Sequence, residues 1–212
     1  MNTNFLKPFF LVICVLFISK MNAETSEGYY IDKNNDTIYA TFQTTPFSKM
    51  FYRATYMTLQ QGVTVITKSG SEEDFTPLDI LSFTIFVKDK KRNTIKDTLT
   101  FDSKTYKVFN RDISEFLRRV VKGKANLYIY HYLNLNYGTN GGGMNTAPKQ
   151  EEAYILEDAN KKFKNITIEG NFKEDMVKIF ADCPSVVNKI ENKTYTKKNC
   201  VEMVKEYNAC SK

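Results

Sequence analysis

The only histidine of the chain, His131, lies among tyrosines in the stretch ANLYIYHYLN. A histidine can act as a general base or as a metal ligand. Acyl transfer would also need a nucleophilic serine in a G-x-S-x-G turn, and the sequence contains no such turn. In a strand, the face that holds this histidine also holds Leu127, Ile129 and Leu133. We therefore expect His131 to be structural, and we expect no catalytic residue, no metal site and no cofactor.

The opposite face of the same strand carries three tyrosines, Tyr128, Tyr130 and Tyr132. Neighbouring side chains on one face are about 7 Å apart. Such a stripe can stack on sugar rings or pack against a partner protein, because tyrosine has a large amphipathic surface. The three residues are our candidate binding surface. The alternative, which we favour, is that the C-terminal helices cover them.

Three cysteines lie outside the N-terminal apolar segment: Cys183, Cys200 and Cys210. If residues 196–208 are helical, Cys200 and Cys210 are about 15 Å apart along the axis. A disulfide needs Cα atoms within about 7 Å, so this pair is excluded. If the three predicted helices run up, down and up, the third ends on the same side as the first, so Cys210 lies near Cys183. We therefore predict the disulfide Cys183–Cys210. The pair Cys183–Cys200 stays open as the competing arrangement.

Acidic residues occur together in SEEDF and in EEAYILED. Two carboxylates that face each other across a cleft could hydrolyse a glycosidic bond. Adjacent acids are also typical of solvated turns, and the sequence does not separate the two cases. A carboxylate-dependent hydrolase of envelope polymers is therefore the alternative function.

From residue 28 to about 168, short β-rich runs alternate with polar or glycine-bearing turns. They are GYYI, TIYATF, MFYRATYMTLQ, GVTVITK, ILSFTIFVK, NTIKDTLTF, KTYKVF, ISEFLRRVV, LYIYHYL, EEAYILED and KFKNITIEG. ISEFLRRVV also suits a short helix, but the turn at Lys122-Gly123-Lys124 favours one arm of a hairpin. Many short strands without intervening helices predict an antiparallel sheet, either rolled or arranged as a sandwich.

After the last of these runs, the apolar residues recur with the period of a helix. The segments NFKEDMVKIFADC, PSVVNKIEN and TKKNCVEMVKEYNAC predict three short helices, which begin at Asn171, Pro184 and Thr196. The predicted fold class is α+β. An antiparallel β-rich body covers 24–170, and a disulfide-closed helical segment, 171–212, packs on it.

Residues 1–23 have the three parts of a signal peptide. Lys7 is the positive region, Phe9 to Ile18 is the apolar core, and Ala23 ends a small-residue cleavage site. The core is shorter than the roughly 20 residues of a membrane-spanning helix. We expect an exported protein that is periplasmic, envelope-associated or secreted, with no transmembrane segment after signal cleavage. An uncleaved anchor is the alternative.

The net charge of +6 is spread over many short segments. A nucleic-acid-binding protein would need a basic stripe with aromatic residues for stacking. The nearest such segment, NKTYTKKN at 192–199, is typical of a solvated helix start. We therefore expect no nucleic-acid partner.

One segment, 138–145 within NLNYGTNGGGMNTAPK, is rich in glycine. Consecutive glycines lose much conformational entropy when they are ordered. A hairpin tip explains this segment, and a loop that closes over a ligand is the alternative. A phosphate-binding P-loop is excluded because no Gly-Lys-Ser/Thr ending follows.

Several motifs resemble a pattern in an uncharacterised family of exported bacterial proteins. They are the opening GYYIDKNNDTIYATF, a GK hairpin before a Tyr-rich strand, a glycine-rich loop, DCP at 182–184 and YNAC at 207–210. The resemblance implies a location in the cell envelope. It also supports the pairing of Cys183 with Cys210, because Cys200 does not belong to the pattern. It implies no enzymatic activity.

Together these features predict an exported, non-enzymatic protein that binds a partner in the cell envelope, either a protein or a glycan. The prediction rests on the signal peptide and on the lack of a nucleophile motif or cofactor fingerprint in the sequence.

Overall fold

The computed structural model describes residues 24–44, 52–89, 92, 94–108, 111–134, 149–166 and 170–210. The expected signal peptide, 1–23, and the glycine-rich segment, 138–145, lie outside these residues. Within them, no helix is both long and apolar enough to cross a membrane.

The described strands form one antiparallel sheet of ten. In chain order they are β1 (Glu24–Ile31), β2 (Thr37–Thr44), β3 (Val63–Ile66), β4 (Glu72–Phe75), β5 (Ser82–Lys88), β6 (Ile95–Val108), β7 (Arg111–Val121), β8 (Asn126–Asn134), β9 (Lys149–Glu157) and β10 (Phe163–Asn165). Their spatial order is β10-β9-β8-β7-β6-β5-β1-β2-β3-β4. Most neighbours are therefore joined by hairpins, whereas β5 returns past the first four strands to pair with β1. The expected antiparallel β-rich body is confirmed.

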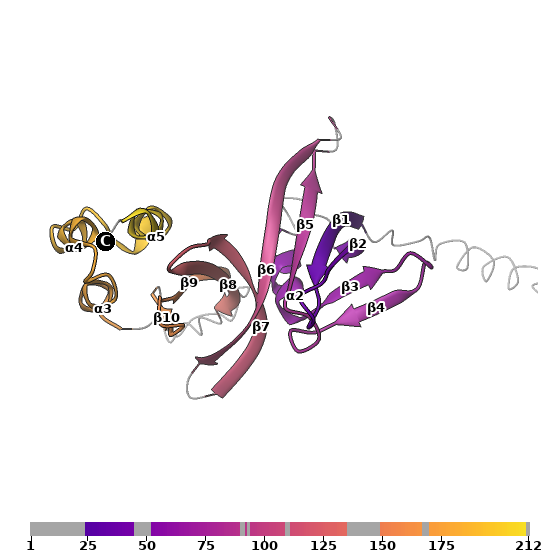
Figure 1. Cartoon of the computed structure of the whole chain (residues 1–212), viewed down its shortest axis with the longest axis horizontal. Helices are drawn as coiled ribbons and strands as arrows, with labels where there is room; N and C mark the ends of the chain where they lie inside the picture. The colour runs from indigo at the N-terminus through magenta and orange to yellow at the C-terminus, as the bar shows by residue number, and fades with distance from the viewer. Residues whose placement is uncertain are drawn as a thin grey trace, which may run out of the picture.

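The helices are α2 (Tyr52–Gln61), α3 (Phe172–Ile179), α4 (Pro184–Glu191), the 3₁₀ turn η1 (Lys197–Asn199) and α5 (Cys200–Ala209). Figure 1 shows α3, α4 and α5 together at one end of the molecule, beyond β8 and β9. Pro184 opens α4, and the Thr196 hydroxyl accepts a hydrogen bond from the backbone N–H of Lys198. Asn171 precedes α3 but makes no side-chain cap bond. The three C-terminal helices, and with them the α+β class, are confirmed.

Three of the expected strand segments differ in the structure. MFYRATYMTLQ was expected as a strand, but all except its first two residues belong to α2, in which Tyr56, Leu59 and Gln60 are buried at helical spacing. NTIKDTLTF and KTYKVF were expected as two strands, but they form the single strand β6. Asp102, in the polar break expected between them, and Lys104, the first residue of KTYKVF, form ion pairs on one face of the sheet.

The second half of the sheet is strongly curled. Strands β6 and β9 are three spacings apart, which is about 14 Å in a flat sheet. Nevertheless, the Lys104 ammonium on β6 lies 3.3 Å from a carboxylate oxygen of Glu157 on β9. The rings of Tyr106 on β6 and Phe163 on β10 have centroids 6.0 Å apart. The sheet from β6 to β10 is therefore rolled around a concave face, and its buried residues are Tyr106, Leu117, Tyr128 and Ile155.

The helices cover the face opposite this concave one. On β8, Leu127 belongs to the cluster under the C-terminal helices, and the His131 ring stacks on Tyr56 of α2. Both residues alternate with Tyr128, which faces the concave side. A second core, which includes Phe42, Phe83 and Phe101, lies between α2 and the first half of the sheet. One face of the sheet thus carries all the described helices.

Gln60 of α2 joins this helix to the backbone of β8. The described pairing of β7 with β8 ends at Arg118 and Ile129, whereas β8 continues beside β9 to Asn134. Past this point the backbone N–H of His131 donates to Oε1 of Gln60 (2.6 Å), and Nε2 of Gln60 donates to the His131 carbonyl (3.0 Å). The buried amide therefore takes the place of a neighbouring strand.

We expect Gln60→Leu to lower the free energy of unfolding by about 2–4 kcal/mol, because two buried backbone groups of His131 lose their partner. Urea denaturation measures the change. Gln61→Leu is the matched control, since Gln61 is the next residue of the same helix and is exposed. An equal loss in both variants would contradict the role assigned to Gln60.

Candidate functional site

The tyrosines of the expected binding surface do not form one exposed stripe. Tyr128 is fully buried, whereas Tyr130 and Tyr132 are half-buried and stack on each other with centroids 6.0 Å apart. The covering elements are the curled strands and not the C-terminal helices, which lie on the other face. This part of the expectation is corrected, because a sequence pattern shows which residues share a face but not which way the sheet curls.

The expected structural residue, His131, lies in the core. The residue is 2% exposed, and its ring is nearly parallel to that of Tyr56, with centroids 4.7 Å apart. Nδ1 is 3.6 Å from a carboxylate oxygen of Glu152. Among the residues that the structure describes, no group of three or more His, Cys, Asp and Glu side chains could hold a metal ion.

Cys183 and Cys210 form a disulfide with Cα atoms 6.0 Å apart, which is the pair that the sequence predicts. Cys200 is buried at the start of α5. Burial, with a smaller effect of the Glu202 charge, raises the pKa of its thiol to about 12. A thiol with this pKa is not a nucleophile at neutral pH, because the thiolate is the reactive form.

Three of the motifs named above, the GK turn, DCP and YNAC, meet at one place beside this disulfide. The Lys124 ammonium bonds to Asp182 and lies 4.6 Å from the centroid of the Tyr207 ring. The Asn208 side chain accepts from the backbone N–H of Ala125 (2.8 Å) and donates to its carbonyl (2.9 Å). We call Lys124, Asp182, Tyr207, Asn208 and the Cys183–Cys210 disulfide the tail clasp, because together they fasten the helices to the β7–β8 turn. These motifs therefore have a structural role in this chain.

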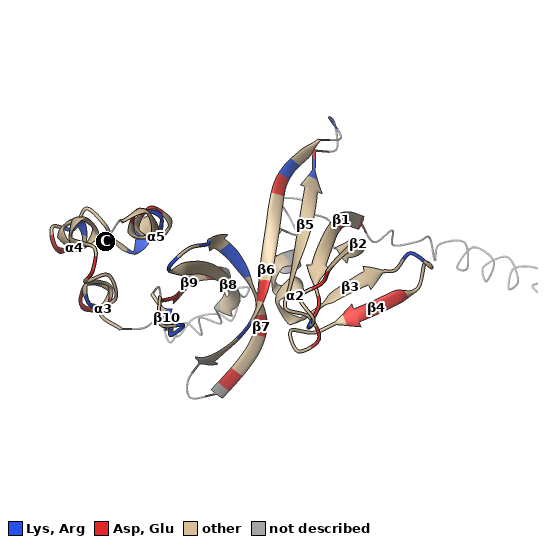
Figure 2. Ribbon diagram, viewed as in Figure 1, with Lys and Arg blue, Asp and Glu red and all other residues tan. Residues whose placement is uncertain are grey.

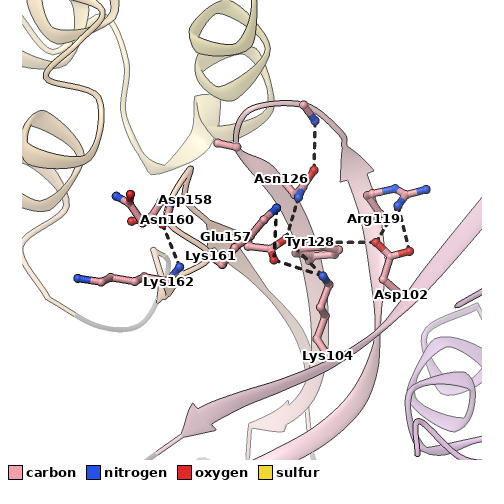
Figure 3. A network of polar contacts seen from close by, with 12 residues as sticks. Asp102, Lys104, Arg119, Asn126, Tyr128, Glu157, Asp158, Asn160, Lys161 and Lys162 are labelled. Carbon is pink, nitrogen blue, oxygen red and sulfur yellow. Dashed lines mark hydrogen bonds and ion pairs between the residues drawn. The ribbon is translucent and has the colours of Figure 1, made fainter. Parts of the chain in front are cut away.

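Asp102 and Glu157 are two carboxylates that lie close together, in a network on the concave face (Figure 3). The Tyr128 hydroxyl lies 3.2 Å from Asp102 and 3.0 Å from Glu157. Each carboxylate also has a cation, Arg119 at 2.8 Å from Asp102 and Lys104 at 3.3 Å from Glu157. The network links β6, β7, β8 and β9, and therefore holds the curl closed.

The protonation of Glu157 argues against an acid catalyst in this network. Burial alone would raise the pKa of its carboxyl group, but the hydrogen bond from Asn126 and the charge of Lys104, with smaller contributions, lower it overall. A general acid in a glycosidase needs a raised pKa so that it is protonated at neutral pH. Glu157 is instead ionised, buried and paired.

The lowered pKa predicts how stability depends on pH. Because the folded state favours ionised Glu157, its contribution to stability is present above the ordinary pKa of about 4.3 and is lost as the pH falls below it. We expect Glu157→Gln to reduce stability at pH 7 and to differ little from wild type in strong acid. Denaturation at several pH values measures this. Glu27→Gln, in the exposed ion pair with Lys88, is the control with a small effect.

Among the described residues, the one exposed aromatic side chain lies elsewhere, on the first half of the sheet. Along β2, Ala40 and Phe42 point to the core under α2, so Tyr39 and Thr41 point to the face without it. Tyr39 is 70% exposed. It borders a cleft of about 340 Å³ that we call the Tyr39 cleft, which is lined by Glu27, Gly28, Tyr39, Ala40, Thr41, Ile66, Thr67, Lys68 and Phe86.

Aromatic contacts hold Tyr39 in place although it is exposed. The half-buried Tyr29 ring on β1 lies between Tyr39 and Phe86, with centroid distances of 5.9 Å and 6.1 Å. Tyr29 is the direct cross-strand partner of Tyr39. The exposed ring is therefore braced before any ligand binds, which reduces the entropy lost on binding.

Tyr39 and its neighbours were not among the predicted site residues. The opening segment GYYIDKNNDTIYATF was interpreted as two strands and as one motif of the resemblance, and not as a binding site. The available signal was the alternation in TIYATF, which places Tyr39 and Phe42 on opposite faces. This alternation does not contain the pairing of β1 with β5, which brings Phe86 beside Tyr29.

Comparison with protein families finds no family model that matches this chain, and comparisons with curated proteins and with solved structures find no similar protein.

Proposed function

We propose that this chain is an exported, non-enzymatic protein of the cell envelope that binds a glycan in the Tyr39 cleft. The observation that carries the proposal is the exposure of Tyr39, 70%, at the border of a cleft on the helix-free face of the sheet. The ring is not an isolated apolar side chain but part of an aromatic group with Tyr29 and Phe86, and contiguous apolar patches on a surface are typical of binding sites. Tyrosine suits a sugar ligand because its ring packs against apolar C–H groups and its hydroxyl forms hydrogen bonds.

The size of the site favours a glycan over a partner protein. A volume of about 340 Å³ lies within the usual range of small-ligand sites, about 300–1,000 Å³. A stable protein interface buries about 800 Å² on each partner, which needs a larger complementary surface. Glu27, Thr41, Thr67 and Lys68 supply polar groups in the same cleft.

Export is supported by the signal-like residues 1–23 and by the disulfide. Disulfides form and persist in oxidising compartments. The resemblance to a family of exported bacterial proteins points to the same location. A periplasmic or envelope-associated protein would meet envelope glycans there.

Replacing Tyr39 tests the proposal. We expect Tyr39→Ala to weaken the binding of soluble envelope oligosaccharides about tenfold, whereas Tyr39→Phe retains most of the affinity because it keeps the ring. Isothermal titration calorimetry measures the dissociation constants. Leu78→Ala is the matched control, because Leu78 is also 70% exposed but does not line the cleft.

Two results would contradict the proposal. One is an equal affinity of the wild type, Tyr39→Ala and Leu78→Ala for the oligosaccharides. The other is the release of new reducing ends from the polymer, which would favour the alternative function, a carboxylate-dependent hydrolase.

A further inference from the structure

The apolar side chains at the Tyr39 cleft form a staggered row across the strands and not along them. Phe86 on β5, Tyr39 on β2 and Ile66 on β3 line the cleft, and Tyr29 on β1, beside the cleft, contacts both Phe86 and Tyr39. Thr41 pairs in register with both Glu27 and Ile66, so two polar side chains interrupt the row. All four side chains lie on the face opposite α2. Three strand spacings make the row about 14 Å long. A single sugar ring would cover only part of it.

The charges beside the row are of both signs. Glu27 forms an ion pair with Lys88 at 2.8 Å. Lys68 lies in the β3–β4 turn, and Figure 2 shows this basic turn next to the acidic strand β4. On β4, Glu72 pairs in register with Ile66 and hydrogen-bonds to Gln43. Neither sign of charge dominates, so the cleft offers no electrostatic preference for an acidic or a basic ligand.

From these two observations we infer that the ligand is a linear oligosaccharide of neutral sugars that lies across β5, β1, β2 and β3. The inference rests on the proposed function and adds the substrate class. Successive sugar rings would contact Phe86, Tyr39 and Ile66, with Tyr29 bracing the first two. Sugar hydroxyl groups would bond to Thr41 within the row and to the charged side chains beside it, which neutral polar groups can do without disturbing the Glu27–Lys88 pair.

If the oligosaccharide lies across the row, its affinity for the protein must depend on the number of sugar units. A trisaccharide reaches Phe86 and Tyr39 together, whereas a monosaccharide would contact Tyr39 alone, because that ring is the more exposed of the two. Each additional aromatic contact contributes about a three- to tenfold gain in affinity. Salt should change the affinity little, because the ligand carries no charge and salt screens only charged groups.

The experiment is a calorimetric titration of the purified protein with neutral glucose oligosaccharides, from the monosaccharide to the hexasaccharide, at low and high salt. We expect the affinity to rise to the trisaccharide and then to level off, without salt dependence. Phe86→Ala should lose about three- to tenfold in affinity for the trisaccharide and nothing for the monosaccharide. Unchanged monosaccharide binding also shows that this variant is folded. Leu78→Ala is again the control.

The outcomes separate the inference from the proposed function. If a uronic-acid or amino-sugar oligosaccharide binds the wild type more tightly than its neutral counterpart, or if the monosaccharide binds as tightly as the trisaccharide, the inferred ligand class is wrong and glycan binding stands. If no saccharide binds but an extended peptide does, the proposed function is wrong as well.

Discussion

Replacing both Cys183 and Cys210 by serine is expected to lower the free energy of unfolding by about 3–4 kcal/mol under oxidising conditions. The two residues are 27 positions apart, and closing a loop of this length removes that much conformational entropy from the unfolded chain in the entropic model. The loss should be seen in urea denaturation. It should also be seen in the wild type when a reductant is added, whereas the double variant should not respond to the reductant.

Cys200→Ala is the control for this experiment. Its side chain is buried but outside the disulfide, so the variant should lose only a small packing contribution and should keep its response to the reductant. Peptide mapping without reduction should recover Cys183 joined to Cys210. A disulfide that includes Cys200, or a double variant as stable as the wild type, would contradict the tail clasp.

Gly28→Ala is expected to destabilise the protein by about 3 kcal/mol or more and to abolish binding in the Tyr39 cleft. A Cβ atom at residue 28 would lie 1.9 Å from the backbone oxygen of Thr84 and 2.9 Å from the Phe42 ring. The Thr84 oxygen belongs to β5 and cannot move away without separating β5 from β1, and overpacking of this kind costs 1–3 kcal/mol or more. The pairing of β1 with β5 also places Phe86 beside Tyr29.

Gly70→Ala is the contrasting control. A Cβ atom there would meet nothing within 4 Å, but φ is +85°. The expected loss is about 1 kcal/mol, caused by backbone strain alone, and binding should be unaffected. Thermal unfolding and calorimetry on both variants measure the difference. If Gly28→Ala keeps wild-type stability and affinity, the close approach of β1 to β5 is not essential to the site.

The parts of the fold that depend on local patterns could be predicted from the sequence. The helical period after residue 170 predicts the three C-terminal helices, and the turn at Lys122-Gly123-Lys124 predicts the β7–β8 hairpin. The cysteine spacing within those helices was enough to exclude one pair and to favour another. Each of these conclusions uses residues that are near one another in the chain.

The parts that depend on distant pairing could not be predicted. The curl that buries Tyr128 arises because β6 meets β9 and β10, and the segment of α2 has the composition of a strand but is stabilised as a helix by packing on the sheet. The position of Tyr39 beside Phe86 depends on β5 returning to β1. No periodicity within a single segment contains this information.

The most direct test of glycan binding in the Tyr39 cleft is a nuclear magnetic resonance titration of the isotope-labelled protein with neutral oligosaccharide. The amide resonances expected to shift are those of residues 27–29, 39–41, 66–68 and 86, while those of α3, α4 and α5 stay unchanged. Shifts confined to β8 around Tyr130 and Tyr132, or no shifts at all at saturating sugar, would contradict the assignment of this cleft as the binding site.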